Sequence, residues 1–244
     1  MIDLHNDAHL HTAFSLGRDS VSVLVCAGEQ AGLSELTFAD RVGPDSGWLA
    51  SYRAAIHRAR QRTDLTLRCG VEVEAIGTDG WLAFPADLGG LEVISVGLSR
   101  LPLPAGLVGP EAVRSLIAAG AVETRAVIEQ LVTVTCLAVE RVSRYAPTLL
   151  ARPLAFLTMA GIDDASIPDD AMAELARACH THGTVVEVSE RYRAPSTRMA
   201  SVLVDAGVSL VAASDARRVA EVGVWEYVRE MATTLAQRPA QPLT

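Results

Sequence analysis

Short apolar segments alternate with amphipathic helical patterns along the whole chain, and this alternation restricts the fold more than any other feature. Strand patterns occur at residues 2–10, 35–39, 66–73, 92–96, 148–150, 184–188 and 209–213. Helical periodicity occurs at residues 20–31, 48–62, 110–118, 123–145, 169–181, 196–206 and 219–235. Strands that alternate with helices in this way favour a parallel sheet with the helices outside it.

Seven strands fit either a closed barrel or an open, doubly wound sheet. Polar residues directly follow, or lie near the ends of, several predicted strands: His9, His11, Asp40, Glu72, Glu187 and Asp215. A barrel of this class displays its functional groups at the carboxyl ends of its strands, so this arrangement favours the barrel. The chain has no GxGxxG motif, Walker loop or Gly-x-Ser-x-Gly motif, which argues against a nucleotide-binding fold and a serine hydrolase.

Arginine supplies all 21 basic residues of the 244-residue chain, and lysine is absent. Schiff-base chemistry, a lysine base and a lysine-bearing phosphate loop are therefore excluded. The net charge of -8 argues against nucleic acid or an anionic membrane as a partner. The four cysteines are far apart, and neither a signal peptide nor a membrane-spanning segment is recognisable, so we expect a cytoplasmic protein with reduced thiols.

Histidines are concentrated at the start of the chain. Three of the six lie within the first eleven residues: His5, His9 and His11. Asp7, His9 and His11 are spaced by two, so on an extended strand their side chains point to one face. Two imidazoles and a carboxylate that converge at a strand end are a common beginning of a metal site. We expect His5 to pack at the floor of a barrel rather than to bind metal.

Further short motifs follow this run in order: Phe38-Ala39-Asp40, Gly70-Val71-Glu72, Val186-Glu187-Val188-Ser189 and Ser214-Asp215-Ala216. Together with Asp7-x-His9-x-His11, this ordered set resembles the PHP (polymerase and histidinol phosphatase) superfamily, and most of all its histidinol-phosphatase branch. The resemblance extends over nearly the whole chain. It implies a distorted seven-stranded, TIM-like βα barrel with a di- or trinuclear metal site at its carboxyl-terminal mouth. We therefore expect one α/β domain over residues 1–236, followed by a polar tail at 237–244.

The chain departs from the family pattern at several metal-ligand positions. Residues that stand where the family usually has histidine are Arg41, Gly97, Arg152 and Arg217, and Leu16 stands where aspartate is common. Residues that match the family's ligands for one of the metals are His9, His11, Glu72 and Asp215. The resemblance therefore implies at most one divalent ion, Zn, Mn or Fe by ligand type, and leaves open that no ion is bound.

Arginine cannot bind a metal ion, because its guanidinium group stays protonated. It can instead neutralise the remaining acids, and we predict that Arg152 or Arg217 pairs with Glu72 or Asp215. The same kind of group can equally bind a phosphate or carboxylate ligand. We assign substrate binding to Arg41, Arg191 and Arg193, with Arg198 at the same rim.

These residues are compatible with three functions from different classes. The first is a divergent metal-dependent hydrolase, similar to a phosphoesterase, that acts on a small anionic metabolite. In this hypothesis Asp40 transfers protons, while Arg152 and Arg217 stabilise developing negative charge. The second is a catalytically inactive PHP-like protein that binds an anionic ligand or a protein partner through the arginine-filled pocket. A third is an accessory module of a replication system, which the acidic net charge disfavours.

Overall fold

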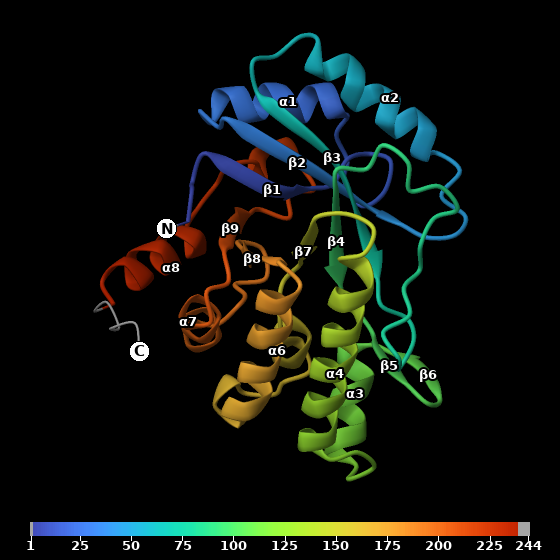
Figure 1. Ribbon diagram of the computed structural model, residues 1–244, viewed down its shortest axis with the longest axis vertical. Coiled ribbons are helices and arrows are strands. Elements are labelled where there is room, and N and C mark those ends of the chain that lie inside the picture. The colour runs from blue at the N-terminus through green and yellow to red at the C-terminus, as the bar shows by residue number, and fades with distance from the viewer. Residues whose placement is uncertain (1, 239–244) are drawn as a thin grey trace.

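Seven parallel strands form a nearly closed barrel in the computed structural model, which describes residues 2–238 (Figure 1). In their order around the barrel, the strands are β1 (Asn6–Leu10), β2 (Glu35–Val42), β3 (Thr66–Glu74), β4 (Val93–Gly97), β7 (Thr148–Leu150), β8 (Val185–Ser189) and β9 (Leu210–Ala213). Leu10 at the end of β1 bridges to Ala216 beyond β9, which brings the first and last strands together. The predicted TIM-like barrel of a single α/β domain is confirmed.

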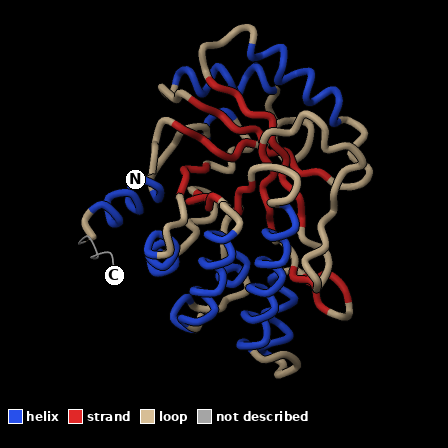
Figure 2. The backbone as a smooth tube through the Cα atoms, in the orientation of Figure 1, coloured by secondary structure: helices blue, strands red, loops and turns tan. Residues whose placement is uncertain are grey.

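Helices form an outer layer around the strands (Figure 2). They are α1 (Val21–Gln30), α2 (Leu49–Arg60), α3 (Pro110–Ala118), α4 (Thr124–Val142), α5 (Ala155–Met159), α6 (Asp169–Thr181), α7 (Thr197–Asp205) and α8 (Tyr227–Ala236). Figure 1 shows α1 and α2 outside β1, β2 and β3, whereas α4 and α6 pack together on the other side of the barrel. The described residues also form two short 3-10 helices, η1 (Asp164–Ser166) and η2 (Val219–Glu221), and a hairpin of β5 (Leu101–Leu103) and β6 (Gly106–Val108).

Alternation along β3 sends its side chains into two environments. Cys69, Val71 and Val73 belong to the apolar core between strands and helices, where Tyr52 is among the largest fully buried side chains. Glu72 lies on the opposite face of the strand, inside the barrel. Its contacts with His9 of β1 and with Arg152 beyond β7 show this position. One strand therefore supplies both the core and the candidate site.

The interior of the barrel is apolar at one end and polar at the other. Ala8, Val93 and Leu149 form a small apolar cluster towards the amino-terminal ends of the strands. Buried polar side chains such as His11, Glu72 and Asp215 occupy the carboxyl-terminal ends. The polar end is thus the one at which barrels of this class carry their functional groups.

The prediction of one continuous helix over residues 219–235 is wrong. The chain forms the short turn η2 and begins α8 only at Tyr227. Between them, Gly223 has a φ of +66°, a left-handed conformation that favours glycine. A Cβ at this position would lie 2.8 Å from the Cβ of Ala31. The sequence patterns also miss α5 and the β5–β6 hairpin, because segments of three to five residues carry too little periodicity.

His5 lies outside the barrel, so its predicted packing at the barrel floor is wrong. Its side chain is exposed, and its Nδ1 lies 3.1 Å from the carbonyl oxygen of Gly32. The reason is that β1 begins only at Asn6, one residue later.

The expected polar tail is described only at its start. Arg238 pairs with Asp205 of α7 at 2.7 Å, and residues 239–244 lie outside the described residues. Within residues 2–238, no helix is both long and apolar enough to cross a membrane.

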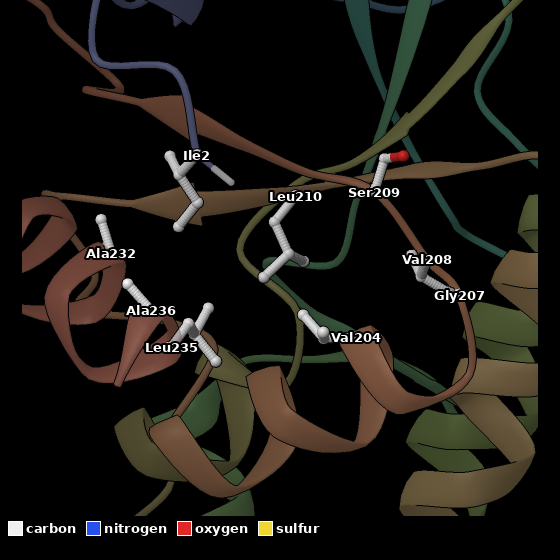
Figure 3. A pocket seen from close by; sticks show the side chains of 9 residues that line it. All are labelled: Ile2, Val204, Gly207, Val208, Ser209, Leu210, Ala232, Leu235 and Ala236. Atoms are coloured by element: carbon white, nitrogen blue, oxygen red, sulfur yellow. The ribbon is translucent and has the colours of Figure 1, made fainter. Parts of the chain in front are cut away.

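A pocket of about 490 Å³, whose lining side chains are mostly apolar, lies beside the amino-terminal end of β9, between α7 and α8 (Figure 3). Val204 of α7, Leu210 of β9 and Leu235 of α8 contribute to its lining. None of its lining residues belongs to the polar end of the barrel. The polar cluster, rather than this pocket, is the candidate functional site.

Candidate metal centre

The carboxyl-terminal end of the barrel gathers buried histidines and acids from strands that are distant in sequence. His9 lies on β1 and His11 just beyond it, Glu72 lies on β3, and Asp215 follows β9. Their side chains are at most 2% exposed. His9, His11 and Glu72 form a group whose ligand atoms lie within 4.8 Å of one another.

Asp7 does not join this group, although its spacing predicts the same face. It accepts hydrogen bonds from the backbone N–H groups of Ser214 at 2.9 Å and Gly223 at 3.4 Å. The pairing of β1 with β2 shifts its register between Asp7 and Leu10, so the regular alternation expected of a strand is interrupted there. Asp7 therefore ties β1 to the segment after β9.

The separations between ligand atoms suit a single metal ion. Glu72 Oε2 lies 3.4 Å from His9 Nε2 and 3.6 Å from His11 Nε2. His11 Nε2 also lies 3.6 Å from Asp215 Oδ1. These distances are long for hydrogen bonds. Ligands that each lie about 2.0–2.2 Å from one tetrahedral ion are about 3.3–3.6 Å apart, so the separations between Glu72 and the two histidines match a shared ion. Asp215 matches in its distance to His11 and lies outside the group of ligand atoms that are all within 4.8 Å of one another.

Several of these ligand atoms have no hydrogen-bond partner among the described residues. They are Nε2 of His9, both ring nitrogens of His11 and Oδ1 of Asp215. Buried polar atoms are nearly always paired, so a cluster of unpaired ones that face each other indicates an arrangement for a cation. Imidazole nitrogens and carboxylate oxygens are suitable ligands for Zn, Mn and Fe. The residues present therefore fit one divalent transition-metal ion.

Glu187 on β8 orients His9. Its Oε1 lies 2.8 Å from His9 Nδ1 and accepts a longer hydrogen bond from the Ser95 hydroxyl at 3.3 Å. A carboxylate can only accept, so Nδ1 carries the proton, and Nε2 is the nitrogen that faces Glu72. Carboxylates that bind histidine in this way orient histidine ligands at metal sites. The sequence alone leaves the role of Glu187 open. Its contact with Nδ1 indicates that it holds the imidazole ring of His9 in place.

The acids around His9 favour a cation at its Nε2, which is a proton in the absence of an ion and which a metal ion would displace on binding. Burial by itself lowers the pKa of His9, but Glu187, followed by Glu72, raises it well above the ordinary value of 6.5. The pKa of His11 is lowered to about 3, first by burial and then by the neighbouring His9. His11 is therefore neutral and keeps a nitrogen lone pair free for a ligand bond.

Arg152, two residues beyond the end of β7, bridges the two acids. Its Nη2 pairs with Glu72 Oε1, and its Nη1 lies 3.3 Å from Glu72 Oε2 and 3.2 Å from Asp215 Oδ2. Burial raises the pKa of Glu72, but Arg152, followed by His9, outweighs burial and holds this pKa well below its usual range. The prediction that Arg152 or Arg217 pairs with Glu72 or Asp215 is confirmed, and Arg152 pairs with both acids.

Three further arginines approach the same acids from the rim. Arg41 Nη2 lies 2.9 Å from Glu72 Oε1. Nε of Arg191 and Nε of Arg217 each lie 3.6 Å from Asp215 Oδ1. The side chains of these arginines are between 27% and 30% exposed, so they contact solvent as well as the acids.

Tyr192 connects two of the arginines, and sequence reasoning missed it. Its hydroxyl accepts a hydrogen bond from Arg217 Nη2 at 3.1 Å, and the guanidinium of Arg152 lies 5.1 Å from its ring centroid. A guanidinium at this distance from an aromatic ring is attracted by the ring face. The sequence offers one signal for Tyr192: it is an aromatic residue between two arginines, Arg191 and Arg193, just after a predicted strand.

No protein-family model matches the chain, and no curated protein matches its sequence. The putative histidinol phosphatase HisK from Listeria monocytogenes is similar in structure, with a TM-score of 0.69 over 89% of this chain and 97% of its own, at 12% identity. This chain has a PHP-like fold.

A second structure supports the same conclusion about the fold. Histidinol phosphate phosphatase HisK from Lactococcus lactis subsp. lactis has a TM-score of 0.62 over 94% of this chain and 91% of its own, also at 12% identity. That protein was crystallised in complex with zinc, L-histidinol and phosphate.

Asp40, on β2 of the PHP-like barrel, holds the loop that follows β1. Its oxygens accept hydrogen bonds from the Thr12 hydroxyl at 2.7 Å, from the Thr12 backbone N–H at 2.9 Å, and from the Ser15 hydroxyl. Burial raises its pKa to about 6, although these hydrogen bonds lower it. The assignment of proton transfer to Asp40 stays a prediction.

Two of the arginines expected at the rim make other contacts. The guanidinium of Arg193 lies 4.8 Å from the ring centroid of Tyr227 and pairs with Glu230 at 3.4 Å, and both partners belong to α8. Arg198 donates to the carbonyl oxygens of Asp164 and Ile167 at 2.8 and 3.0 Å. The structure thus brings Arg41, Arg191 and Arg217 to the acids, but not Arg193 or Arg198.

The backbone is unusual at two residues of the centre. Arg152 has a φ of +40° and Asp215 a φ of +53°, both in the left-handed region that side chains other than glycine rarely adopt. Such conformations are costly and cluster at functional sites. Each of them follows the carboxyl end of a strand and turns a charged side chain into the barrel.

Proposed function

We propose that the chain hydrolyses small phosphate esters with one divalent transition-metal ion, Zn, Mn or Fe. The residues that would hold this ion are His9, His11, Glu72 and Asp215. The observation that carries the proposal is the buried group of His9, His11 and Glu72, in which imidazole nitrogens without a hydrogen-bond partner lie 3.4 and 3.6 Å from a Glu72 oxygen, with the unpaired Oδ1 of Asp215 3.6 Å from His11. The PHP-like fold supports it, because a neighbour with this fold is a histidinol phosphate phosphatase in complex with zinc and phosphate.

The chain's own residues would bind and orient the substrate. A divalent ion at such a site supplies Lewis acidity, which polarises a phosphoryl oxygen and lowers the pKa of water. Arg41, Arg191 and Arg217 are partly exposed and offer N–H donors to phosphoryl oxygens, where they stabilise the negative charge that develops during hydrolysis. Their contacts with the buried acids restrict the guanidinium groups before a ligand arrives.

The direct test combines metal analysis with an assay of phosphate release. Protein purified without chelator is expected to contain about one transition-metal ion per chain by elemental analysis. It is expected to release phosphate from at least one compound in a panel of small phosphate monoesters. Treatment with EDTA should remove this activity, and one of Zn, Mn or Fe should restore it. Protein without metal and without phosphate release would overturn the proposal.

A second function, the binding of an anionic ligand without catalysis, is favoured by one specific observation. The guanidinium of Arg152 already supplies positive charge to both buried acids, so the centre is neutralised in part without any ion. In that case the rim arginines bind phosphate whether or not metal is present. Calorimetry with inorganic phosphate in EDTA separates the two functions: binding that persists without metal or turnover favours the ligand-binding protein.

Glu187→Gln is expected to weaken Zn binding by about 10–100-fold, although it removes no ligand. The amide keeps the size of the side chain but loses the charge that holds Nδ1–H of His9. Competition against a chromophoric chelator measures the Zn affinity. Glu174→Gln, which removes the same charge at an exposed position of α6, is the matched control. Equal Zn affinity in Glu187→Gln and the unchanged chain would show that Glu187 does not support His9.

A further inference from the structure

Arg152 makes the contacts that a cation between two carboxylates would make. Its Nη1 lies 3.3 Å from Glu72 Oε2 and 3.2 Å from Asp215 Oδ2, while Nη2 pairs with Glu72 Oε1. His11 also neighbours both acids, and its Nε2 lies 3.6 Å from Glu72 Oε2 and from Asp215 Oδ1. One guanidinium and one imidazole thus join the same pair of acids.

The surrounding residues are shaped to hold this guanidinium. A Cβ at Gly97 would lie 2.8 Å from Arg152 Nη2 and would overlap Glu72 Oε1, so the ion pair occupies the space that a larger residue on β4 would fill. Tyr192 lies against the guanidinium on another side, at 5.1 Å from its ring centroid to Cζ. Arg152 is itself only 3% exposed. Its position is therefore built into the barrel rather than adopted by a mobile surface side chain.

A fixed charge at this place must affect any metal ion bound nearby. The guanidinium stays protonated, so its charge is permanent. It repels a divalent ion and at the same time reduces the negative charge that Glu72 and Asp215 present to it. Because all three side chains are buried, solvent ions screen this effect only weakly.

We propose that Arg152 is an internal cation of the metal centre, which limits the centre to one ion and weakens the binding of that ion. The inference rests on the proposed metal site but concerns a separate property, the number and affinity of ions that its two acids accept. The centre thereby keeps its two buried acids compensated even before an ion binds.

The test is the Zn affinity and stoichiometry of Arg152→Gln. Without the guanidinium, Glu72 and Asp215 lose their shared counter-charge, and a metal cation is the strongest available replacement. Equilibrium dialysis with Zn²⁺ should therefore give binding at least ~10-fold tighter than in the unchanged chain, or a second ion per chain. Arg68→Gln is the matched control, because it removes the same charge from the same strand as Glu72 but at an exposed position paired with Glu35.

A second measurement covers the case in which Arg152→Gln folds poorly. Its melting temperature should rise more on addition of Zn²⁺ than that of the unchanged chain, because the ion replaces the lost counter-charge. Arg152→Lys, which keeps a positive charge, should remain close to the unchanged chain in stoichiometry. Equal or weaker Zn binding by Arg152→Gln, with no larger rise in melting temperature, would overturn the inference.

The outcomes also separate this inference from the proposed hydrolase. An unchanged chain that binds no Zn, together with an Arg152→Gln variant that binds it, would refute the proposed function and support the inference. The proposed function would be supported, and the inference refuted, by a different pair of results. The unchanged chain would bind one ion and hydrolyse phosphate esters, and Arg152→Gln would bind Zn with the same affinity and stoichiometry.

Discussion

Replacement of both His9 and His11 by alanine is expected to abolish stoichiometric metal binding. The two imidazoles are half of the proposed ligand set, and the acids that remain, Glu72 and Asp215, are already bridged by Arg152. Since loss of a single supporting partner costs about 10–100-fold in metal affinity, loss of two ligands should cost more than about 10³-fold. Elemental analysis of protein purified without chelator measures the ion content, and phosphate release should fall to background.

The matched control removes two imidazoles elsewhere. His5→Ala/His57→Ala changes two exposed histidines and should keep the metal content and the activity of the unchanged chain. The circular dichroism spectrum and a cooperative thermal transition establish that each variant is folded at the temperature of the metal analysis. A folded His9→Ala/His11→Ala variant that retains one ion per chain would show that the ligand set is wrongly assigned.

The barrel could be predicted from the sequence because parallel strands are buried on both faces. All residues of β4 and β7 are buried, and both strands appear in the sequence as short apolar runs. The break before α8 could not be predicted in this way, since a glycine is also tolerated inside a helix. The backbone N–H of Gly223 donates a hydrogen bond to Asp7, and a Cβ at this position would lie 2.8 Å from the Cβ of Ala31. Both residues are distant in sequence, so no local pattern predicts the left-handed conformation of Gly223.

Local spacing predicted only the two imidazoles of the candidate site, His9 and His11. Glu72, Asp215 and the arginines in place of histidines came from the resemblance to the PHP superfamily, and the need of buried acids for positive charge then predicted that Arg152 or Arg217 pairs with them. The contact between His9 and Glu187 joins residues 178 positions apart. It depends on how β1 and β8 face each other across the barrel, which no local pattern determines.

Neighbouring arginines also show that local sequence does not determine where a side chain points. Arg191 and Arg193 flank one tyrosine and have similar surroundings in the sequence, yet Arg191 reaches Asp215, whereas Arg193 turns to Tyr227 and Glu230 of α8. Arg193 has a φ of +47°, so the loop adopts a left-handed turn at this residue. Side-chain direction in a loop follows from such a turn and from the helix packed against it, and the spacing of residues does not encode either.

Gly97→Ala is expected to destabilise the protein by about 2–4 kcal/mol. The added Cβ would overlap Glu72 Oε1 and lie 2.8 Å from Arg152 Nη2. Both atoms belong to the ends of side chains that can move, but both side chains are buried and bound to each other, so they make room only by parting. The cost is therefore the loss of a buried ion pair rather than a clash with backbone. Urea denaturation measures the change in the free energy of unfolding.

Two further variants identify the ion pair as the cause. Gly43→Ala adds a Cβ where no atom lies within 4 Å and should leave the free energy of unfolding nearly unchanged. In an Arg152→Ala background the ion pair is already broken, so Gly97→Ala should there cost much less than it does alone, which a double-mutant cycle measures directly. An equal cost in both backgrounds would mean that the added methyl group acts on its own surroundings and that Gly97 does not serve to make room for Arg152.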